Sequence, residues 1–344
     1  MKKLSMLILV LAFMLAGCNS DTKTLKVFNW GVYMDATLID EFEEEYNVRV
    51  VYDEFDSNES MYTKLMSGEK YDVIVPSDYM VQRLIEENLL QKLDKKVVNL
   101  SDVLPNVLNQ NFDPNNEYSA PYFWGNVGIL YDTTKVDVKD LEEGWDILIN
   151  PKYKGALYFY DSERDAFMVA LKALGYSANS KIDSQLDSAF DWLTQLNTTM
   201  EPIYVTDDVI DNMIAGNKSI AVVYSGDAAY IVDENENMAF YAPEEGTNLW
   251  IDNMVIPANS ENPELANAWI AFMLSEDAQS RNTLEVGYST VHKTVWEYMI
   301  SDEGDYAGNE AYAVRTNYVS DELFKYDEEL KVKMSDLWLK IKAQ

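Results

Sequence analysis

Aromatic rings, carboxylates or both occur at five places along this chain, each directly after or within a short apolar run. The five places read "FNWGVY" (28–33), "PSDYM" (76–80), "YDSERD" (160–165), "YSGD" (224–227) and "LWIDN" (249–253). Arg164 is the only cation in these stretches. The side chains of interest are Trp30, Tyr33, Ser77, Tyr79, Asp165, Tyr224, Asp227, Trp250 and Asp252.

These residue types together favour a ligand that is both cationic and aliphatic. Aromatic faces attract organic cations by ~0.5–2 kcal/mol each, and a carboxylate accepts charge-assisted hydrogen bonds from ammonium groups. Aromatic walls also bury methylene groups, at ~0.8 kcal/mol per CH2. A linear polyamine uses all three interactions. A sugar remains an alternative, although sugar sites usually include Arg, Lys, Asn or Gln donors as well.

Short β-rich runs alternate with amphipathic helical ones, which predicts βαβ units and parallel sheets covered on both faces. We expect strands at 24–30, 48–55, 71–77, 154–161, 219–226 and 249–258. We expect helices at 34–46, 57–68, 79–90, 163–175, 184–196 and 263–275. Ligands of open α/β sheets bind beyond the carboxyl ends of the strands, where the aromatic and acidic residues lie.

The first 18 residues, "MKKLSMLILVLAFMLAGC", have the pattern of a secretory signal and are too short to span a membrane. "LAGC" resembles the lipobox of bacterial lipoproteins, which implies cleavage before Cys18 and lipidation of that residue. An ordinary signal peptide is the alternative. We therefore expect a signal peptide at 1–17, a tether at 18–24 and an extracytoplasmic protein anchored to the membrane. Cys18 is the only cysteine, so a disulfide within the mature domain is excluded.

The remaining 300 or so residues are too many for one simple core and predict two lobes. Acidic residues outnumber basic ones by 59 to 27, for a net charge of −32. Such a field repels nucleic acid and attracts cationic ligands. Charge alone, however, is explained as well by an acidic surface that favours solubility.

The chain resembles the spermidine/putrescine-binding components of polyamine ABC importers. The resemblance covers most of the mature chain and is carried by stretches such as "FDPNNEYSAPYFWGNVGILY", "YKGALYFYDSERDAF" and "LWIDNMVIPA". It implies an α/β type II periplasmic-binding-protein fold, in which each of two lobes has a mixed, mainly parallel sheet flanked by helices. We expect one lobe at 25–130 plus 255–305 and the other at 131–254 plus 306–344.

The resemblance also implies roles for single residues. Trp30 and Tyr33 line the ligand-binding slot between the two lobes, with Gly31 allowing a tight turn between them. Ser77 and Tyr79 match a ligand-contacting "SxY" of the family. Asp252 grips an amine beside Trp250, and Asp165 matches an amine-binding acid. The permease subunits of an importer are the implied partner, and no cofactor is expected.

Two departures from the family pattern leave the preferred amine open. Spermidine-preferring members carry an acid where this chain has Ser162, and Asp161 faces the other way in a strand. Tyr224 replaces a tryptophan, and Asp227 is gained as in putrescine-preferring members. Asp165, Asp227 and Asp252 suit either a diamine or a triamine. The family's glutamine contact near the C-terminus has no convincing counterpart in "YAVRTNYVSDELF".

Catalysis is not expected. His292 is the only histidine, and no G-x-S-x-G elbow, Walker A loop, zinc-ligand set or EF-hand loop accompanies it. Paired carboxylates of a glycoside hydrolase are not excluded by composition. The alternatives are therefore a binding protein for a sugar or metal, or a secreted carboxylate-based hydrolase.

Overall fold

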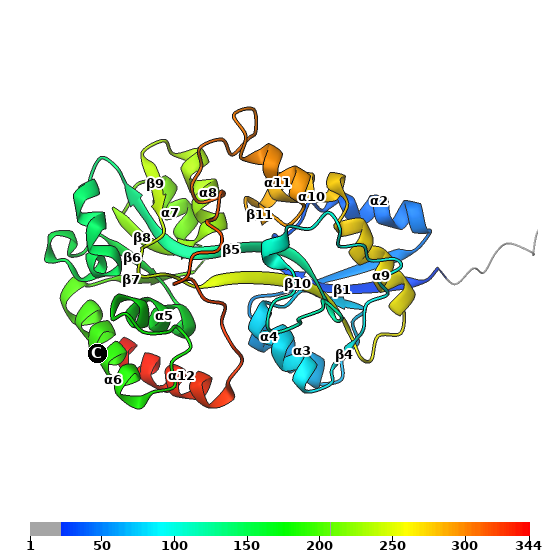
Figure 1. The fold of residues 1–344 in the computed structure, drawn as a ribbon, viewed down its shortest axis with the longest axis horizontal. Coiled ribbons are helices and arrows are strands. Elements are labelled where there is room, and N and C mark those ends of the chain that lie inside the picture. Colours follow the sequence, from blue (N-terminus) through cyan, green and yellow to red (C-terminus); the bar gives the residue numbers. More distant parts are fainter. Residues whose placement is uncertain (1–21, 207) are drawn as a thin grey trace, which may run out of the picture.

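The structure is a computed structural model, and it describes residues 22–206 and 208–344. The predicted signal peptide at 1–17, Cys18 and most of the tether lie outside the described residues. The described chain forms two α/β lobes joined by long strands (Figure 1).

The first lobe is built on three parallel strands whose connecting helices pack on the sheet. β1 (Thr24–Trp30) pairs with β2 (Arg49–Phe55) and with β3 (Val73–Ile74). The connecting helices are α2 (Thr37–Tyr46), α3 (Asn58–Met66) and α4 (Asp78–Glu86). Each was predicted from its sequence within a few residues. Leu38 and Phe42 of α2 are both buried, as expected for apolar residues spaced at the 3.6-residue helical period.

The second lobe repeats this arrangement. β6 (Leu157–Tyr160) pairs in parallel with β7 (Ile203–Val205) and β8 (Ile220–Tyr224). The helices of this lobe are α5 (Glu163–Ala173), α6 (Asp183–Gln195), α7 (Val209–Ile214), α8 (Ser225–Glu234) and α12 (Glu328–Lys342). The buried faces of α5, α6 and α12 contribute side chains to a single core.

Two long strands run from one lobe into the other (Figure 1). β5 (Ser119–Asp132) and β10 (Leu249–Pro257) pair antiparallel, with a bulge between Asp252 and Asn253. β9 (Met238–Tyr241), β11 (Ser289–Thr290) and β4 (Leu90–Gln91) add further antiparallel pairs. After β10 the chain forms α9 (Pro263–Met273), α10 (Glu276–Val286) and α11 (Lys293–Met299).

The sheets are mixed, as predicted, but they are less parallel than predicted. Every described pairing of β5 or β10 with a neighbouring strand is antiparallel. Parallel pairs are confined to the outer strands of each lobe.

The hydrophobic core divides along the same two strands. On β5, Trp124 belongs to a cluster of the first lobe, whereas Val127 belongs to a cluster of the second. Trp250 and Ile251 of β10 lie with the first lobe. The passage between the lobes therefore falls near residues 125–126 and 248–249. The exact lobe boundaries given above stay predictions.

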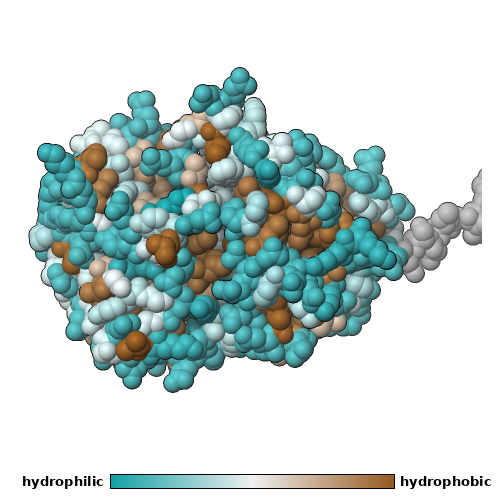
Figure 2. Space-filling view, in the orientation of Figure 1, coloured by the Kyte–Doolittle hydropathy of each residue, from teal (hydrophilic) through white to brown (hydrophobic). Residues whose placement is uncertain are grey.

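The surface in view is largely hydrophilic (Figure 2). Hydrophobic residues gather along the middle of this face and are scattered elsewhere. No helix of the described residues is both long and apolar enough to span a bilayer.

Candidate functional site

Asp252 lies in the middle of β10 and is only 6% exposed. The hydroxyl of Tyr33, from the loop after β1, donates to its Oδ2 at 2.7 Å. Its other oxygen, Oδ1, is buried and has no hydrogen-bond partner in the structure. Burial raises the pKa of Asp252 to about 6, although the Tyr33 hydrogen bond and the nearby Ser77 hydroxyl oppose the shift.

Trp250 is on the same strand, two residues earlier, and is also buried. The edges of two tyrosines meet its ring, Tyr288 at 5.4 Å and Tyr224 at 6.2 Å between centroids. A Cβ at Gly125 of the paired strand would lie 2.4 Å from this indole, so only glycine leaves room for the ring. The indole N–H is buried without a hydrogen-bond partner.

The second lobe contributes a similar pair at the end of β8. The hydroxyl of Tyr224 donates to Oδ2 of Asp165 at 2.8 Å. Asp165 is 3% exposed, and its Oδ1 has no hydrogen-bond partner in the structure. Burial raises the pKa of this carboxyl as well. Ser162, in contrast, caps α5 by accepting from the backbone N–H of Asp165, so it has a structural role.

Asp227 joins the two lobes through a residue that the sequence analysis did not assign to the site. Tyr288, which follows α10 on the first lobe, donates its hydroxyl to Oδ1 of Asp227 at 2.7 Å. A Cβ at Gly226 would lie 1.5 Å from the Tyr288 ring, so the close approach requires glycine. The local sequence signal for Tyr288 is "GYST". Its glycine, Gly287, ends α10 with φ +82°, and Tyr288 follows directly.

Ser77 and Tyr79 flank the N-terminus of α4. Asn58 donates to both hydroxyl oxygens, at 3.0 Å each. Ser77 also lies opposite Asp252 in an isolated β-bridge. The face of the Tyr79 ring is covered by the guanidinium of Arg164, 4.2 Å from the ring centroid. Arg164 therefore reaches across from the second lobe, and Tyr79 is less available to a ligand than predicted.

Asp78 lies between these two residues and was not included among the predicted site residues. It is 1% exposed and accepts from the backbone N–H of Ile251 at 3.0 Å. Burial raises its pKa to about 8, although two backbone hydrogen bonds oppose the shift. Asp78 thus fixes β10 beside α4.

Trp30 ends β1 and is half-buried. Its ring packs on Phe55 at 4.6 Å, and its indole N–H is buried without a partner in the structure. No hydrogen bond or ring contact of the described residues joins it to Asp252 or Trp250. The turn after β1 also differs from the prediction, because the left-handed residue is Val32, with φ +49°, and not Gly31.

Four of the predicted side chains share one feature, a buried polar atom with no hydrogen-bond partner in the structure. They are Asp252 Oδ1, Asp165 Oδ1, Trp30 Nε1 and Trp250 Nε1. A buried carboxylate without a cationic partner costs several kcal/mol. The arrangement therefore suits a ligand that brings positive charge and hydrogen-bond donors to the two carboxylates and apolar surface to the rings.

Three residues outside the predicted site have structural roles. Nδ1 of His292 accepts from the backbone N–H of Val295 and caps α11. Asp161 pairs with Lys342 and accepts from the Trp338 indole. In the C-terminal segment, Glu322 binds Lys172 on α5. Across 22–206 and 208–344, no group of three or more His, Cys, Asp or Glu side chains is arranged to hold a metal ion.

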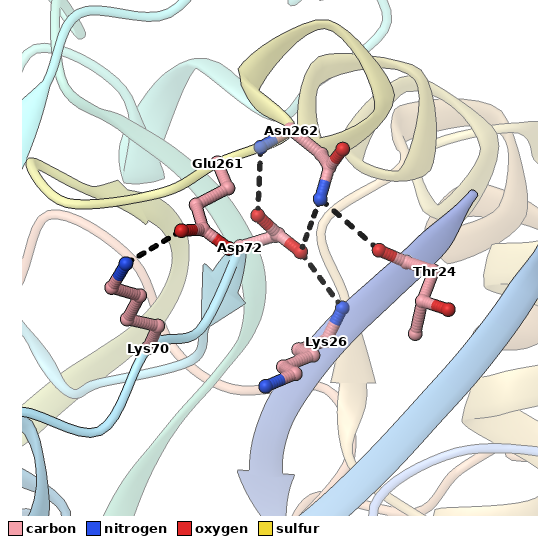
Figure 3. Close-up of a pocket in the computed structure, with 6 residues that line it drawn as sticks. All are labelled: Thr24, Lys26, Lys70, Asp72, Glu261 and Asn262. Carbon is pink, nitrogen blue, oxygen red and sulfur yellow. Dashed lines mark hydrogen bonds and ion pairs between the residues drawn. The ribbon is translucent and has the colours of Figure 1, made fainter. Parts of the chain in front are cut away.

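A separate cavity lies at the opposite end of β1 from Trp30 (Figure 3). Its carboxylate, Asp72, accepts from the backbone N–H groups of Lys26 and Asn262 at 2.9 and 3.0 Å. Lys70 and Glu261 pair with each other at its rim. These hydrogen bonds tie β1 to the loop before α9, which is a structural role.

Comparison with known proteins gives consistent results. The family model described as bacterial extracellular solute-binding protein matches residues 37–308. The spermidine/putrescine-binding periplasmic protein of Escherichia coli K12 is 34% identical over 280 residues, or 80% of each chain. The putrescine-binding periplasmic protein SpuD of Pseudomonas aeruginosa is 30% identical over 332 residues, covering 89% of this chain and 90% of the relative.

Solved structures resemble the chain over nearly its full length. The spermidine/putrescine ABC transporter substrate-binding protein PotD of Streptococcus pneumoniae has a TM-score of 0.81 and 37% identity. The match covers 94% of this chain and 99% of that one. The two-lobed arrangement of strands and helices described above is therefore shared with that structure.

Proposed function

Because the chain belongs to the family of bacterial extracellular solute-binding proteins, we propose that it binds a polyamine between its two lobes and delivers it to an ABC importer. The single observation that carries the choice of ligand is the pair of buried carboxylates, Asp252 and Asp165, each with one unpartnered oxygen among aromatic rings. Relatives named for spermidine and putrescine binding support the same choice.

One ammonium group of the ligand binds Asp252. The Tyr33 hydroxyl holds Oδ2 of this carboxylate, so Oδ1 is left to accept from the ammonium. A charge-assisted hydrogen bond of this kind contributes ~1.5–3 kcal/mol. The positive charge also favours the ionised carboxylate, so binding at a pH near 6 releases a proton from Asp252.

A second ammonium group binds Asp165 in the same way, with Tyr224 holding the other oxygen. The methylene groups between the two ammonium groups lie along Trp250 and the tyrosines that meet its edges. Each buried CH2 contributes ~0.8 kcal/mol. This geometry explains why the site combines rings with acids and has few donors of its own.

The remaining predicted residues take more limited roles in this proposal. Asp227 accepts a hydrogen bond from Tyr288. A third ammonium group of the ligand would compete with Tyr288 for this carboxylate. Ser77 lies opposite Asp252 in the β-bridge, and Tyr79 with Arg164 bounds one end of the slot. Trp30 contributes the face of its ring from the end of β1.

The protein has no reaction of its own in this proposal. Its family consists of solute-binding proteins, and the one histidine caps a helix. The ligand is captured by hinge closure of the lobes and released to the permease subunits of an importer.

Lipid anchoring through Cys18 is part of the same proposal. "LAGC" precedes β1 by only a few residues, since β1 begins at Thr24, so the tether is short and holds the first lobe close to the membrane. Mass spectrometry of the mature N-terminus tests this directly. A lipid-modified Cys18 supports the anchor, and an unmodified N-terminus elsewhere contradicts it.

Thermal unfolding tests the ligand class. Putrescine or spermidine should raise the melting temperature of the full chain, because a ligand that binds only the folded state stabilises it. Maltose, calcium and EDTA should leave it unchanged. A rise with maltose, or a fall with EDTA, would favour a sugar or a metal instead.

A further inference from the structure

The segment from Ser320 to Glu328, which leads into α12, passes between the two lobes (Figure 1). We call residues 320–328 the strap. Its first part is fixed to the second lobe. Lys172, a lysine of α5 that is only 3% exposed, donates to the carbonyl of Ser320 at 2.6 Å and pairs with Glu322. Ser177 and Asn179 donate to the same carboxylate.

The strap also joins the strand that carries the ligand site. The backbone N–H of Leu249 donates to the carbonyl of Glu322 at 2.9 Å, and the N–H of Glu322 donates to Thr247 at 2.9 Å. These bonds are made at the passage between lobes, directly before Trp250. The position of the strap is therefore coupled to the start of β10.

The middle of the strap contacts the first lobe instead. The backbone N–H of Tyr326 donates to Oε1 of Gln82 on α4 at 2.9 Å. The Arg83 guanidinium lies 5.0 Å from the Tyr326 ring centroid and 3.6 Å from the Glu328 carboxylate. Phe324 packs against core side chains of both lobes. The strap therefore bridges the lobes at a second place, outside the two long strands.

These contacts are made with the helix that forms one wall of the slot. α4 begins at Asp78 and Tyr79, and Gln82 and Arg83 lie one turn later on the same helix. Separation of the lobes moves α4 away from the strap, because the strap is held to the second lobe by Glu322 and by α12. The bond from Tyr326 to Gln82 then has to break.

We propose that the strap is a latch, which holds the slot closed and slows release of the ligand without touching it. This inference rests on the proposed function. The contacts to the first lobe are not needed to seat the strap, since Asp327 caps α12 and Asn179 donates to the carbonyl of Leu323. The contacts of the strap to the first lobe therefore favour the closed state. The apparent affinity for the ligand rises in proportion to the population of that state.

The test compares release rates from the full chain loaded with radiolabelled putrescine. Gln82→Met removes the acceptor for Tyr326 and keeps the length of the side chain. Phe324→Ala removes the apolar bridge. Glu86→Ala is the matched control, because Gln82 also donates to Glu86 within α4. Melting temperatures measured alongside show whether each variant is folded.

We expect Gln82→Met to release putrescine roughly two- to tenfold faster than the native chain, the range for one lost hydrogen bond. Phe324→Ala should be at least as fast, and Glu86→Ala should release at the native rate. Native release rates in folded Gln82→Met and Phe324→Ala would overturn the latch. So would equal acceleration by Glu86→Ala, because the effect would then lie within the helix.

A second measurement separates failure of the latch from failure of the proposed function. If the native chain retains no amine, the proposed function fails, and the latch is judged by small-angle X-ray scattering without ligand. A larger radius of gyration in Gln82→Met and Phe324→Ala than in Glu86→Ala supports it. Identical radii in all three variants would overturn it.

Discussion

Replacing Asp252 by asparagine should have opposite effects on ligand binding and on stability. The amide can still accept from Tyr33, as the carboxylate does at 2.7 Å, so the local geometry is kept. What is lost is the negative charge next to the unpartnered oxygen. Removing one partner of a buried charge pair costs ~2–5 kcal/mol. We therefore expect amine affinity to fall by about 30-fold or more.

The ligand-free protein should in contrast become more stable at neutral pH. The folded-state pKa of Asp252 is raised from 3.8 to about 6, so the unfolded chain ionises it more readily. The free-energy penalty of holding the ionised carboxylate in the folded protein is absent below pH 4 and is fully present above pH 6. At pH 7 it is on the order of 3 kcal/mol. Asparagine removes it, so the melting temperature should rise.

Calorimetric titration gives the affinity, and thermal unfolding without ligand at pH 4 and pH 7 gives the stability. Asp161→Asn is the matched control, because Asp161 pairs with Lys342 outside the slot and should bind amines normally. Unchanged amine binding by folded Asp252→Asn would refute the role of this carboxylate. Lower stability of the variant at pH 7 would refute the argument from burial.

Three further outcomes are expected. Amine affinity should weaken roughly tenfold between pH 7 and pH 5, because protonation of Asp252 below about pH 6 competes with the ligand; a flat pH profile by calorimetry would contradict this. Trp250→Ala should weaken binding at least fivefold by removing a wall of the slot, and native affinity would make the ring a core residue only. Tyr288→Phe should alter the putrescine-to-spermidine affinity ratio, since it removes the Tyr288 hydrogen bond to Asp227, and an unchanged ratio would exclude this bond from ligand choice.

Local structure could be predicted well from the sequence, because it depends on short-range patterns. The apolar period of residues 38–46 placed α2, and Ser57 caps α3 as its type suggested. The two-residue spacing of Trp250 and Asp252 placed both on one strand, and both are buried there. The alternation of strands and helices predicted the α/β class, and the resemblance to polyamine-binding proteins supplied the type II fold.

Contacts between segments far apart in the sequence could not be predicted in the same way. Tyr288 reaches Asp227 only because Gly226 leaves space on another element 60 or so residues earlier. Asp78 binds the backbone of β10, which lies more than 170 residues later in the chain. The placement of Arg164 over Tyr79 likewise joins elements of different lobes. Such long-range pairs leave no local period in the sequence.

The most direct test of the central claim is calorimetric titration of the full chain with putrescine and then spermidine. The protein is first unfolded and refolded to remove any bound ligand, and circular dichroism shows that it has refolded. We predict one-to-one binding of at least one amine, with no heat from maltose or calcium. Folded protein that binds neither amine would contradict the claim that Asp252, Asp165 and their rings form a polyamine site.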